Sequence, residues 1–388
     1  MIEPRRPGTI RGLRLLMTTD TVGGVFTYAM TLAAGLVERG AEVHLATMGP
    51  ALKPSQRDAA KDVADLVVHE STFALEWMPE PWEDVERAGE WLLELERRVA
   101  PDLVHLNGYV HGATAFRVPI VVAGHSCVLS WWEAVVGEPP PPELARYRSE
   151  VQRGIRSAAA VIAPTSAMMR CLERHYGPVA TGVVVANGVR APLGTPHARK
   201  EMADLAAGRL WDRAKNIEAL SRAAPSFPGP VRVAGSDQLP DGSRRVLPHL
   251  TALGWLDAEA LGRAMDSAAI FAHPARYEPF GLCPVEAALR GCALVLGDIE
   301  SLREVWGDGA LFVAPNDDEA LSHALRSLAL DDELRRDHAA RATTRAATFT
   351  ATRMVEQTAT VYLQVLGGGC TSLDPIRGQK GTASPCAS

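Results

Sequence analysis

The chain has 388 residues, 47% of them hydrophobic and 22% charged, a balance typical of a globular protein with two domains. The formal net charge is -6 and no long basic run occurs, which argues against a nucleic-acid-binding protein because such a protein needs a concentrated basic face. No apolar segment approaches the roughly 20 residues that span a bilayer, and residues 1–12 lack the apolar core of a signal peptide. The sequence therefore predicts a cytoplasmic protein without a transmembrane segment.

The first half of the chain alternates apolar segments with helical ones. Residues 13–20 (LRLLMTTD) are predicted to form a strand, the turn TVGG follows, and residues 25–40 are predicted to form an amphipathic helix that Gly40 closes. Further strands are predicted in the runs AEVHLATMG, PDLVHLNG, VPIVVAG, AAVIAPT and GVVVANGVR. This alternation indicates an α/β domain with a mostly parallel sheet covered on both faces.

The second half repeats the alternation after a Pro-bearing segment, residues 191–200, that is predicted to be a linker. Its strands are predicted in the runs MADLAAGRL, VRVAGSD, HLTALGWLD, AAIFAHP and CALVLGD, and its helices are expected to run to about Arg345. Residues 349–366 are predicted to form one long amphipathic helix. Residues 367–388 have too little apolar content to pack, so a disordered tail is expected there.

The cysteines and histidines show no pattern of metal ligands. None of the six cysteines belongs to a C-x-x-C pair or a Cys/His cluster, and the eleven histidines include no H-E-x-x-H motif. We interpret these cysteines as small buried thiols, or as thiols without a chemical role, in a reducing compartment. The sequence therefore predicts no metal site.

The most informative segment runs from residue 273 to residue 306. Glu278 and Glu286 lie there with seven residues between them, next to a glycine-bearing turn that separates a predicted buried strand from an Ala-rich helix opened by Glu286. In a parallel sheet, ligands bind where the strands end and the helices begin, and a helix start can hold an anion. Two carboxylates can also accept hydrogen bonds from sugar hydroxyls. A phosphate site beside two hydroxyl acceptors indicates a nucleotide-sugar.

The run EPFGL followed by VEAALRGCALV resembles the signature of the family-four retaining glycosyltransferases with the GT-B fold. The resemblance extends over about residues 13–366, and it is looser in the first half. It implies two Rossmann-like parallel-sheet domains that face each other across a cleft, an acceptor-side domain of residues 1–190 and a donor domain of residues 191–348. It also implies that residues 349–366 cross back onto the first domain.

The resemblance further implies a retaining hexosyltransferase that moves a sugar from a nucleotide diphosphate-sugar, such as a UDP-sugar, to a hydroxyl acceptor. The expected reaction is a same-face attack in which the donor phosphate takes the acceptor proton. No cofactor is expected beyond the nucleotide-sugar co-substrate. The acceptor is expected to be a small molecule, a glycan or a lipid-linked molecule, while the oligomeric state is left open.

The catalytic residues are predicted to be Glu278, His125, Arg209 and Lys215. Arg209 follows an apolar strand and Lys215 comes six residues later, so a planar guanidinium and a point charge could clamp one diphosphate. Two solvated surface cations are the alternative interpretation. In the resembled family, an Arg and a Lys in this GRL…KN pattern bind the donor diphosphate, and a His at the position of His125 lies near the transferred sugar. Because these cations would replace a metal ion, a metal is not expected.

Glu286 is predicted to accept hydrogen bonds from the ribose hydroxyls, whereas Glu278 and the backbone of residues 280–282 would hold the sugar. Gly23 and Gly24 form a turn where backbone can approach a phosphate, although it is not the G-x-G-x-x-G fingerprint of nicotinamide binding. The donor-binding residues are predicted to be Gly23, Gly24, Gly208, Gly235, Trp255, Leu256, Phe280, Gly281, Leu282 and Glu286.

Acceptor-side residues are expected at two places in the first half. Asn107 and Tyr109 end one predicted strand, and Trp131 with Trp132 precedes a Pro run that is expected to form a structured loop. The two tryptophans could pack on a sugar ring or anchor the loop. In contrast to the family pattern, the segment IESLREV carries Ser301 and Glu304 in place of a glycine-rich turn.

Three alternative functions remain open from the sequence. A sugar phosphorylase of the same fold would use the same cations for inorganic phosphate. A nucleotide-sugar epimerase would not need an open acceptor cleft. A nucleotide-sugar-binding protein without transfer activity is disfavoured by the intact set of Glu278, Glu286, Arg209 and Lys215.

Overall fold

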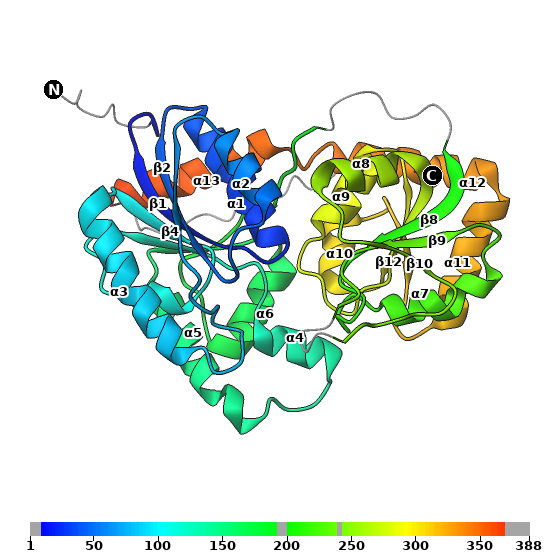
Figure 1. Ribbon diagram of the computed structural model, residues 1–388, viewed down its shortest axis with the longest axis horizontal. Coiled ribbons are helices and arrows are strands. Elements are labelled where there is room, and N and C mark those ends of the chain that lie inside the picture. Colours follow the sequence, from blue (N-terminus) through cyan, green and yellow to red (C-terminus); the bar gives the residue numbers. More distant parts are fainter. Residues whose placement is uncertain (1–8, 192–199, 239–242, 369–388) are drawn as a thin grey trace, which may run out of the picture.

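The protein is described by a computed structural model that covers residues 9–191, 200–238 and 243–368 in two lobes (Figure 1). Most of the predicted linker, at residues 192–199, and most of the predicted tail, at residues 369–388, lie outside the described residues. Each lobe is built on one parallel sheet, and the sheets are connected near residues 188–190 and 349–351.

The first lobe is built on seven parallel strands in the order β3-β2-β1-β4-β5-β6-β7. The strands are β1 (Arg14–Asp20), β2 (Glu42–Met48), β3 (Leu66–Glu70), β4 (Leu103–Leu106), β5 (Ile120–Ala123), β6 (Ala160–Ala163) and β7 (Gly182–Val184). All but β3 were predicted from the sequence. That strand is a half-exposed edge strand, so the apolar signal is weak there.

The second lobe is built on six parallel strands in the order β10-β9-β8-β11-β12-β13. The strands are β8 (Glu201–Ala207), β9 (Val231–Ala234), β10 (Thr251–Gly254), β11 (Ala268–His273), β12 (Ala293–Gly297) and β13 (Leu311–Val313). The two sheets share one strand order, which is the doubly wound order of Rossmann-like domains. The predicted GT-B architecture is therefore confirmed.

Helices cover both faces of each sheet. In the first lobe they are α1 (Gly24–Val37), α2 (Pro54–Lys61), α3 (Trp82–Val99), α4 (Val128–Val135), α5 (Ala145–Ser157) and α6 (Ser166–Tyr176), with the 3-10 turns η1 (Val110–Ala113) and η2 (Pro142–Leu144). In the second lobe they are α7 (Ile217–Ala223), α8 (Ala258–Ser267), α9 (Leu282–Leu289), α10 (Glu300–Trp306), α11 (Asp318–Leu330) and α12 (Asp332–Ala346), with η3 (Ala224–Ser226). The last helix is α13 (Ala351–Leu366).

The near-continuous apolar strands follow from this two-sided cover. In β1, Leu15 and Met17 pack in the core shared with α1 and α13, whereas Leu16 packs in the core on the opposite face with α3, α5 and α6. Successive residues of a strand point to opposite faces, so both sets must be apolar when both faces are buried. The second sheet is packed in the same way between two cores.

The chain returns to the first lobe at its end, as predicted. Helix α13 lies beside α1 in the first lobe (Figure 1), and Val355 of α13 packs so closely on Gly35 that a Cβ added there would lie 2.5 Å from Val355 Cγ2. The two connections between the lobes also pair, because Val189 N–H donates to Phe349 O over 3.0 Å and Ala351 N–H donates to Val189 O over 2.9 Å. The lobes are thus joined by two paired segments.

Two local predictions were wrong. Trp131 and Trp132 lie on helix α4 rather than in a loop, because Cys127 Sγ caps the start of that helix by accepting from Ser130 N–H. Glu286 does not open its helix, since α9 begins at Leu282. Within the described residues, no helix is both long enough and apolar enough to cross a bilayer.

Candidate active site

Most of the predicted site residues lie where each sheet reverses its strand order. In the first sheet β1 lies between β2 and β4, and in the second sheet β8 lies between β9 and β11. Parallel sheets bind ligands outside the carboxyl ends of strands at this reversal. Gly23 and Asn107 follow β1 and β4, while Arg209 and Glu278 follow β8 and β11.

The ends of β8 and β9 approach each other closely in the second lobe. A Cβ on Gly235 would lie 1.9 Å from Gly208 O, and a Cβ on Gly208 would lie 3.0 Å from Lys215 Cγ. Only glycine fits at these two positions. Gly235 allows its strand end to approach the backbone of Gly208, and Gly208 allows the aliphatic part of the Lys215 side chain to pack on it. The loop bearing Arg209 is then held by Leu210 N–H, which donates to Ser236 O over 3.0 Å.

Lys215 and Glu278 form a partly buried ion pair at this edge. Lys215 Nζ donates to Glu278 Oε2 over 2.7 Å, and His273 Nε2 lies 3.2 Å from the same oxygen. Burial alone would raise the pKa of Glu278, but the Lys215 ammonium and the hydrogen bond from His273 hold that pKa below its ordinary value. Glu278 is therefore an ionised acceptor, and Lys215 is fixed beside it.

Arg209 is the more exposed of the two predicted clamp cations. Its Nη2 atom donates to Asp212 Oδ2 over 2.8 Å, and its guanidinium lies 5.0 Å from the centroid of the Trp211 ring. The arginine side chain is 40% exposed, whereas the Lys215 side chain is 23% exposed. Arg209 is thus oriented by one carboxylate and keeps donors for an incoming anion.

The start of α9 faces the glycine turn of the other lobe. Gly281 adopts φ 89° as the residue before α9, and no side chain caps the first turn of that helix. A Cβ on Gly24 would lie 3.8 Å from Leu282 Cδ1, so the predicted glycine turn and the start of α9 are adjacent across the two lobes. The side chain of Phe280 is buried edge-on against Phe349, so only its backbone can face a ligand.

Glu286 lies one turn further along α9, and its carboxylate has no hydrogen-bond partner among the described residues. Burial raises its pKa to about 7, and the nearby Arg290 opposes this only in part because Arg290 pairs with Asp266 at 2.7 Å. A half-buried carboxylate without a protein partner can accept hydrogen bonds from ligand hydroxyl groups.

In the first lobe, His125 and Asn107 lie together. His125 Nε2 is 2.7 Å from Asn107 Oδ1, and the Tyr28 ring of α1 packs edge-on against the imidazole at 4.4 Å. Burial and, less strongly, the neighbouring His105 lower the pKa of His125 to about 3. The ring is therefore neutral at physiological pH and can act as a hydrogen-bonding group, not as a charge.

The remaining predicted residues differ in exposure. Tyr109 is buried in the first-lobe core and its hydroxyl donates to Ser126 O over 3.0 Å, so its side chain does not face a cleft. Trp131 and Trp132 are half-buried on α4. Trp255 is 52% exposed and Lys53 of the first lobe lies 4.2 Å from its ring centroid, whereas Leu256 packs against the second-lobe core.

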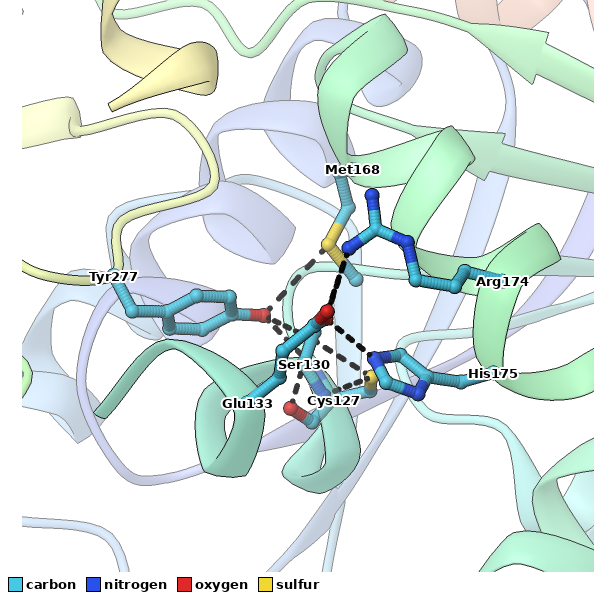
Figure 2. A network of polar contacts seen from close by, with 7 residues as sticks. All are labelled: Cys127, Ser130, Glu133, Met168, Arg174, His175 and Tyr277. Carbon is cyan, nitrogen blue, oxygen red and sulfur yellow. Dashed lines mark hydrogen bonds and ion pairs between the residues drawn. The ribbon is translucent and has the colours of Figure 1, made fainter. Parts of the chain in front are cut away.

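A tyrosine next to Glu278 ties the two lobes together (Figure 2). The Tyr277 hydroxyl lies 2.7 Å from Ser130 Oγ and accepts from Cys127 N–H over 3.2 Å. Only Ser126 separates Cys127 from His125, and Glu278 follows Tyr277 directly. The contact therefore fixes the His125 loop and the Glu278 loop relative to each other.

A second contact between the lobes involves Glu304, the residue of the divergent IESLREV segment. Its carboxylate accepts from Ser166 N–H over 2.6 Å and from Ala167 N–H over 2.8 Å, at the start of α6. An anion at a helix N-terminus is stabilised by free N–H groups and by the helix dipole. Ser301 Oγ also donates to Glu278 O over 2.6 Å. This segment thus contacts the first lobe through Glu304 and fixes the Glu278 loop through Ser301.

Two carboxylates of the site were missed from the sequence. Asp20 ends β1, and its pKa rises to about 7 mainly because the group is buried, although Arg209 across the lobes opposes that rise. Glu76 accepts from Val110 N–H and Tyr109 N–H over 3.0 Å each, and burial raises its pKa to about 7 as well. The position of Asp20, directly before a glycine turn at a strand end, was the available signal. Glu76 has no such signal.

Two family profiles together match most of the chain. The profile described as Glycosyltransferase Family 4 matches residues 22–191, and the profile described as Glycosyl transferases group 1 matches residues 205–345. The chain belongs to the family-four glycosyltransferases of the GT-B fold. The predicted family is therefore confirmed.

Curated relatives match along nearly the whole chain. A glycogen synthase of Mycobacterium tuberculosis is 28% identical over 92% of this chain and 96% of the relative. A phosphatidyl-myo-inositol mannosyltransferase of Mycolicibacterium smegmatis is 27% identical over 90% of this chain and 92% of the relative. These two relatives are named for different activities, so the family membership of this chain does not itself define its acceptor.

Solved structures share the fold at lower identity. Sucrose-phosphate synthase from Thermosynechococcus elongatus has a TM-score of 0.76 at 19% identity, covering 92% of this chain and 100% of that chain. Anabaena HepE, in complex with UDP and glucose, has a TM-score of 0.72 at 17% identity, covering 90% of this chain and 99% of that chain. The two-lobe arrangement is thus shared with glycosyltransferases of known structure.

Proposed function

We propose that this glycosyltransferase moves a hexose from a nucleotide diphosphate-sugar to a hydroxyl acceptor with retention at the anomeric carbon and without a metal ion. The observation that supports this most directly is the partly buried Lys215–Glu278 ion pair at 2.7 Å, placed beside Arg209 and the uncapped start of α9. Cations and free N–H groups suit a diphosphate, whereas an ionised carboxylate suits sugar hydroxyls. The pair places both kinds of partner at one point.

In the proposed mechanism, the second lobe binds the nucleotide part of the donor. Glu286 accepts the ribose hydroxyls, and Gly208 and Gly235 allow the donor to approach the backbone. Arg209, Lys215 and the start of α9 stabilise the charge that grows on the departing diphosphate, which is often the largest catalytic contribution in such reactions. Glu278 holds the sugar hydroxyls and offsets positive charge that develops on the ring.

The first lobe supplies the acceptor side. The glycine turn at Gly23 and Gly24 contacts the donor phosphates from across the lobes, and His125 and Asn107 contact the transferred sugar. The acceptor hydroxyl attacks from the face that the diphosphate leaves, and a phosphate oxygen takes its proton. Trp131 and Trp132 on α4 offer aromatic surface to the acceptor beside this point.

Metal independence is supported by the residues that would replace the cation. Within the described ranges, no group of three or more His, Cys, Asp and Glu side chains is placed to hold a metal ion. Arg209 and Lys215 provide two positive charges at the same place. The reaction then needs the nucleotide-sugar and the acceptor, and no further cofactor.

The relatives suggest which donors to test first. Because the named relatives include a glycogen synthase and mannosyltransferases, and one similar structure contains UDP and glucose, nucleoside diphosphate derivatives of glucose and mannose form the first panel. Thermal shift identifies the donor, since a ligand at a hundred times its dissociation constant stabilises a protein by about 2.7 kcal/mol. Glucan, myo-inositol lipid and small polyol acceptors follow with the identified donor.

Proton NMR of the fresh product, recorded with and without EDTA, tests the mechanism. We expect the donor anomer to be retained and the rate to persist in chelator. An inverted product rules out the same-face reaction, and complete loss of activity in EDTA rules out metal independence. Release of sugar phosphate that depends on inorganic phosphate would instead identify a phosphorylase.

A further inference from the structure

Four polar side chains from distant segments form one hydrogen-bonded chain behind the proposed sugar site. The Tyr362 hydroxyl of α13 lies 2.8 Å from His105 Nδ1, and His105 Nε2 lies 3.3 Å from Asn107 Oδ1. The same Asn107 oxygen lies 2.7 Å from His125 Nε2. The helix that returns from the second lobe is thereby connected to a residue proposed to contact the sugar.

The hydrogen-bond partners of Asn107 fix the direction of this chain. Asn107 Nδ2 donates to Thr18 O over 2.7 Å, so its Oδ1 atom is the one that faces the two imidazoles. The backbone N–H of Asn107 donates to Thr18 Oγ1 over 3.0 Å, which holds the residue against β1. A carbonyl oxygen can only accept, so both His105 and His125 must carry a hydrogen on Nε2.

Both rings are neutral at physiological pH. Burial lowers the pKa of His105 to about 4, and burial with the neighbouring His105 lowers the pKa of His125 to about 3. A neutral imidazole carries one ring hydrogen, so each Nδ1 atom holds a lone pair. In His105 that lone pair accepts from the Tyr362 hydroxyl.

The corresponding atom of His125 is unused by the protein. Within the described part of the chain, His125 Nδ1 has no hydrogen-bond partner, and the residue is partly exposed. Tyr28 packs against both imidazoles, stacked on His105 at 6.5 Å and edge-on to His125 at 4.4 Å, so neither ring can turn without disturbing α1. The unused lone pair therefore has a fixed position.

We infer that Tyr362 is a positioning residue which, through His105 and Asn107, holds His125 as the Nε2–H tautomer and presents Nδ1 as an acceptor for a substrate hydroxyl. This inference rests on the proposed function only for the identity of that hydroxyl, which belongs to the transferred sugar or to the acceptor. It also gives the returning helix a role in the active site besides its packing on α1.

Loss of the Tyr362 hydroxyl has a definite consequence. His105 Nδ1 is then buried without a donor, so only the 3.3 Å contact between Nε2–H and Asn107 Oδ1 still favours the Nε2–H tautomer, and the Nδ1–H tautomer gains population. Its Nε2 lone pair would face the Asn107 oxygen, where two acceptors repel. The Asn107 oxygen then loses one of its two donors, and the orientation of His125 loosens.

The experiment compares the intact protein with Tyr362→Phe by long-range proton–nitrogen NMR of nitrogen-15-labelled histidines at neutral pH. We expect both His105 and His125 as Nε2–H tautomers in the intact protein, and a mixture of His105 tautomers in the variant. Turnover should fall about fivefold, the scale of one neutral hydrogen bond, while the dissociation constant of the free nucleoside diphosphate stays unchanged. An Nδ1–H or a protonated His125 in the intact protein overturns the inference.

Two further variants separate this effect from a loosened helix. Val361→Ala removes a buried apolar group from the same helix and should lower the melting temperature without changing either tautomer. In His105→Gln, the glutamine amide can donate to Asn107 Oδ1 without help from Tyr362. Adding Tyr362→Phe to this variant should therefore lower turnover no further. An equal loss in both backgrounds overturns the inference, as does Tyr362→Phe with unchanged spectra. Because the tautomers are read without substrate, a wrong donor or reaction leaves this test intact.

Discussion

The two lobes present different chemistry to the space between them. The second lobe offers ion pairs, with Lys215 on Glu278 and Arg209 on Asp212. The first lobe offers neutral or protonatable groups, because the pKa of His125 falls to about 3 while that of Asp20 rises to about 7. A fixed charge suits a diphosphate, whereas neutral hydrogen-bonding groups suit the hydroxyls of a sugar or an acceptor. This asymmetry fits the proposed function, in which the second lobe binds most of the donor and the first lobe binds the acceptor.

The largest expected effect comes from removing the Lys215 charge. Lys215→Ala should lower turnover by on the order of a hundredfold or more, as the loss of one donor to a developing oxyanion does elsewhere. It also leaves Glu278 as a buried unpaired carboxylate, which costs about 3–5 kcal/mol of unfolding free energy when a buried pair is broken. Steady-state kinetics and urea unfolding measure the two losses.

The Lys215→Ala/Glu278→Gln double variant tells the two losses apart. It should recover much of the stability, because no buried charge is left alone, but none of the turnover. Lys61→Ala is the matched control, since the Lys61 side chain is 75% exposed and pairs only with a neighbour on its own helix. Near-normal turnover in Lys215→Ala would show that Lys215 does not stabilise the departing diphosphate.

The next prediction separates the two glutamates. Glu278→Gln should lower turnover more than nucleotide affinity, because we propose that Glu278 contacts the sugar, where charge develops in the transition state. Glu286→Gln should weaken binding of free nucleoside diphosphate by about tenfold and leave saturated turnover nearly unchanged, as expected for contacts that are equal in ground and transition states. Calorimetric titration and saturating kinetics check both. Unchanged affinity in Glu286→Gln would show that the ribose assignment is wrong.

The parts of this site that the sequence predicted are those formed by residues close together in the chain. The GRL…KN and EPFGL patterns are local, so the positions of Arg209, Lys215 and Glu278 at strand ends could be read directly. Glu76 and Tyr277 contact residues far away in the chain, and nothing in their local sequence indicates those partners. Asp20 had a local signal, its position between a strand and a glycine turn, but not one that identifies its neighbour Arg209. Helix α4 was predicted as a loop because of the tryptophan pair and the Pro run that follows it. Its cap is a cysteine thiol, an uncommon capping group, so the sequence contains no clear sign of a helix start.

A smaller effect concerns pH. Burial raises the pKa of Glu286 to about 7, so this carboxyl is partly protonated in the free protein near neutrality and ionises as the pH rises. Nucleotide affinity should therefore increase from mildly acidic to mildly alkaline pH. The same raised pKa stabilises the fold below the ordinary range for glutamate, and that stabilisation is lost as the pH rises through about 7.

Glu286→Gln is the control for this pH dependence, because phosphate ionisation of the nucleotide changes over the same interval in both proteins. The difference between the two affinity profiles isolates the carboxylate. If nucleotide affinity changes with pH in the same way in both proteins, the ionisation of Glu286 does not contribute to nucleotide binding. Unfolding free energies over the same interval should fall more steeply with rising pH in the intact protein than in the variant.

The smallest expected effect lies at the contact between the lobes, where the Tyr277 hydroxyl meets Ser130 and Cys127 (Figure 2). Tyr277→Phe keeps the ring and removes one buried hydroxyl, so turnover should fall by about threefold to tenfold, the scale of one hydrogen bond. Nucleotide affinity should change little, because in the proposed mechanism the second lobe makes most of the contacts with the nucleotide. Ser130→Ala should reproduce the loss, whereas adding it to Tyr277→Phe should cost little more, since the two act through one contact. If both single variants weaken nucleotide binding instead, the contact supports the donor lobe itself, and the division of roles between the lobes does not hold at this point.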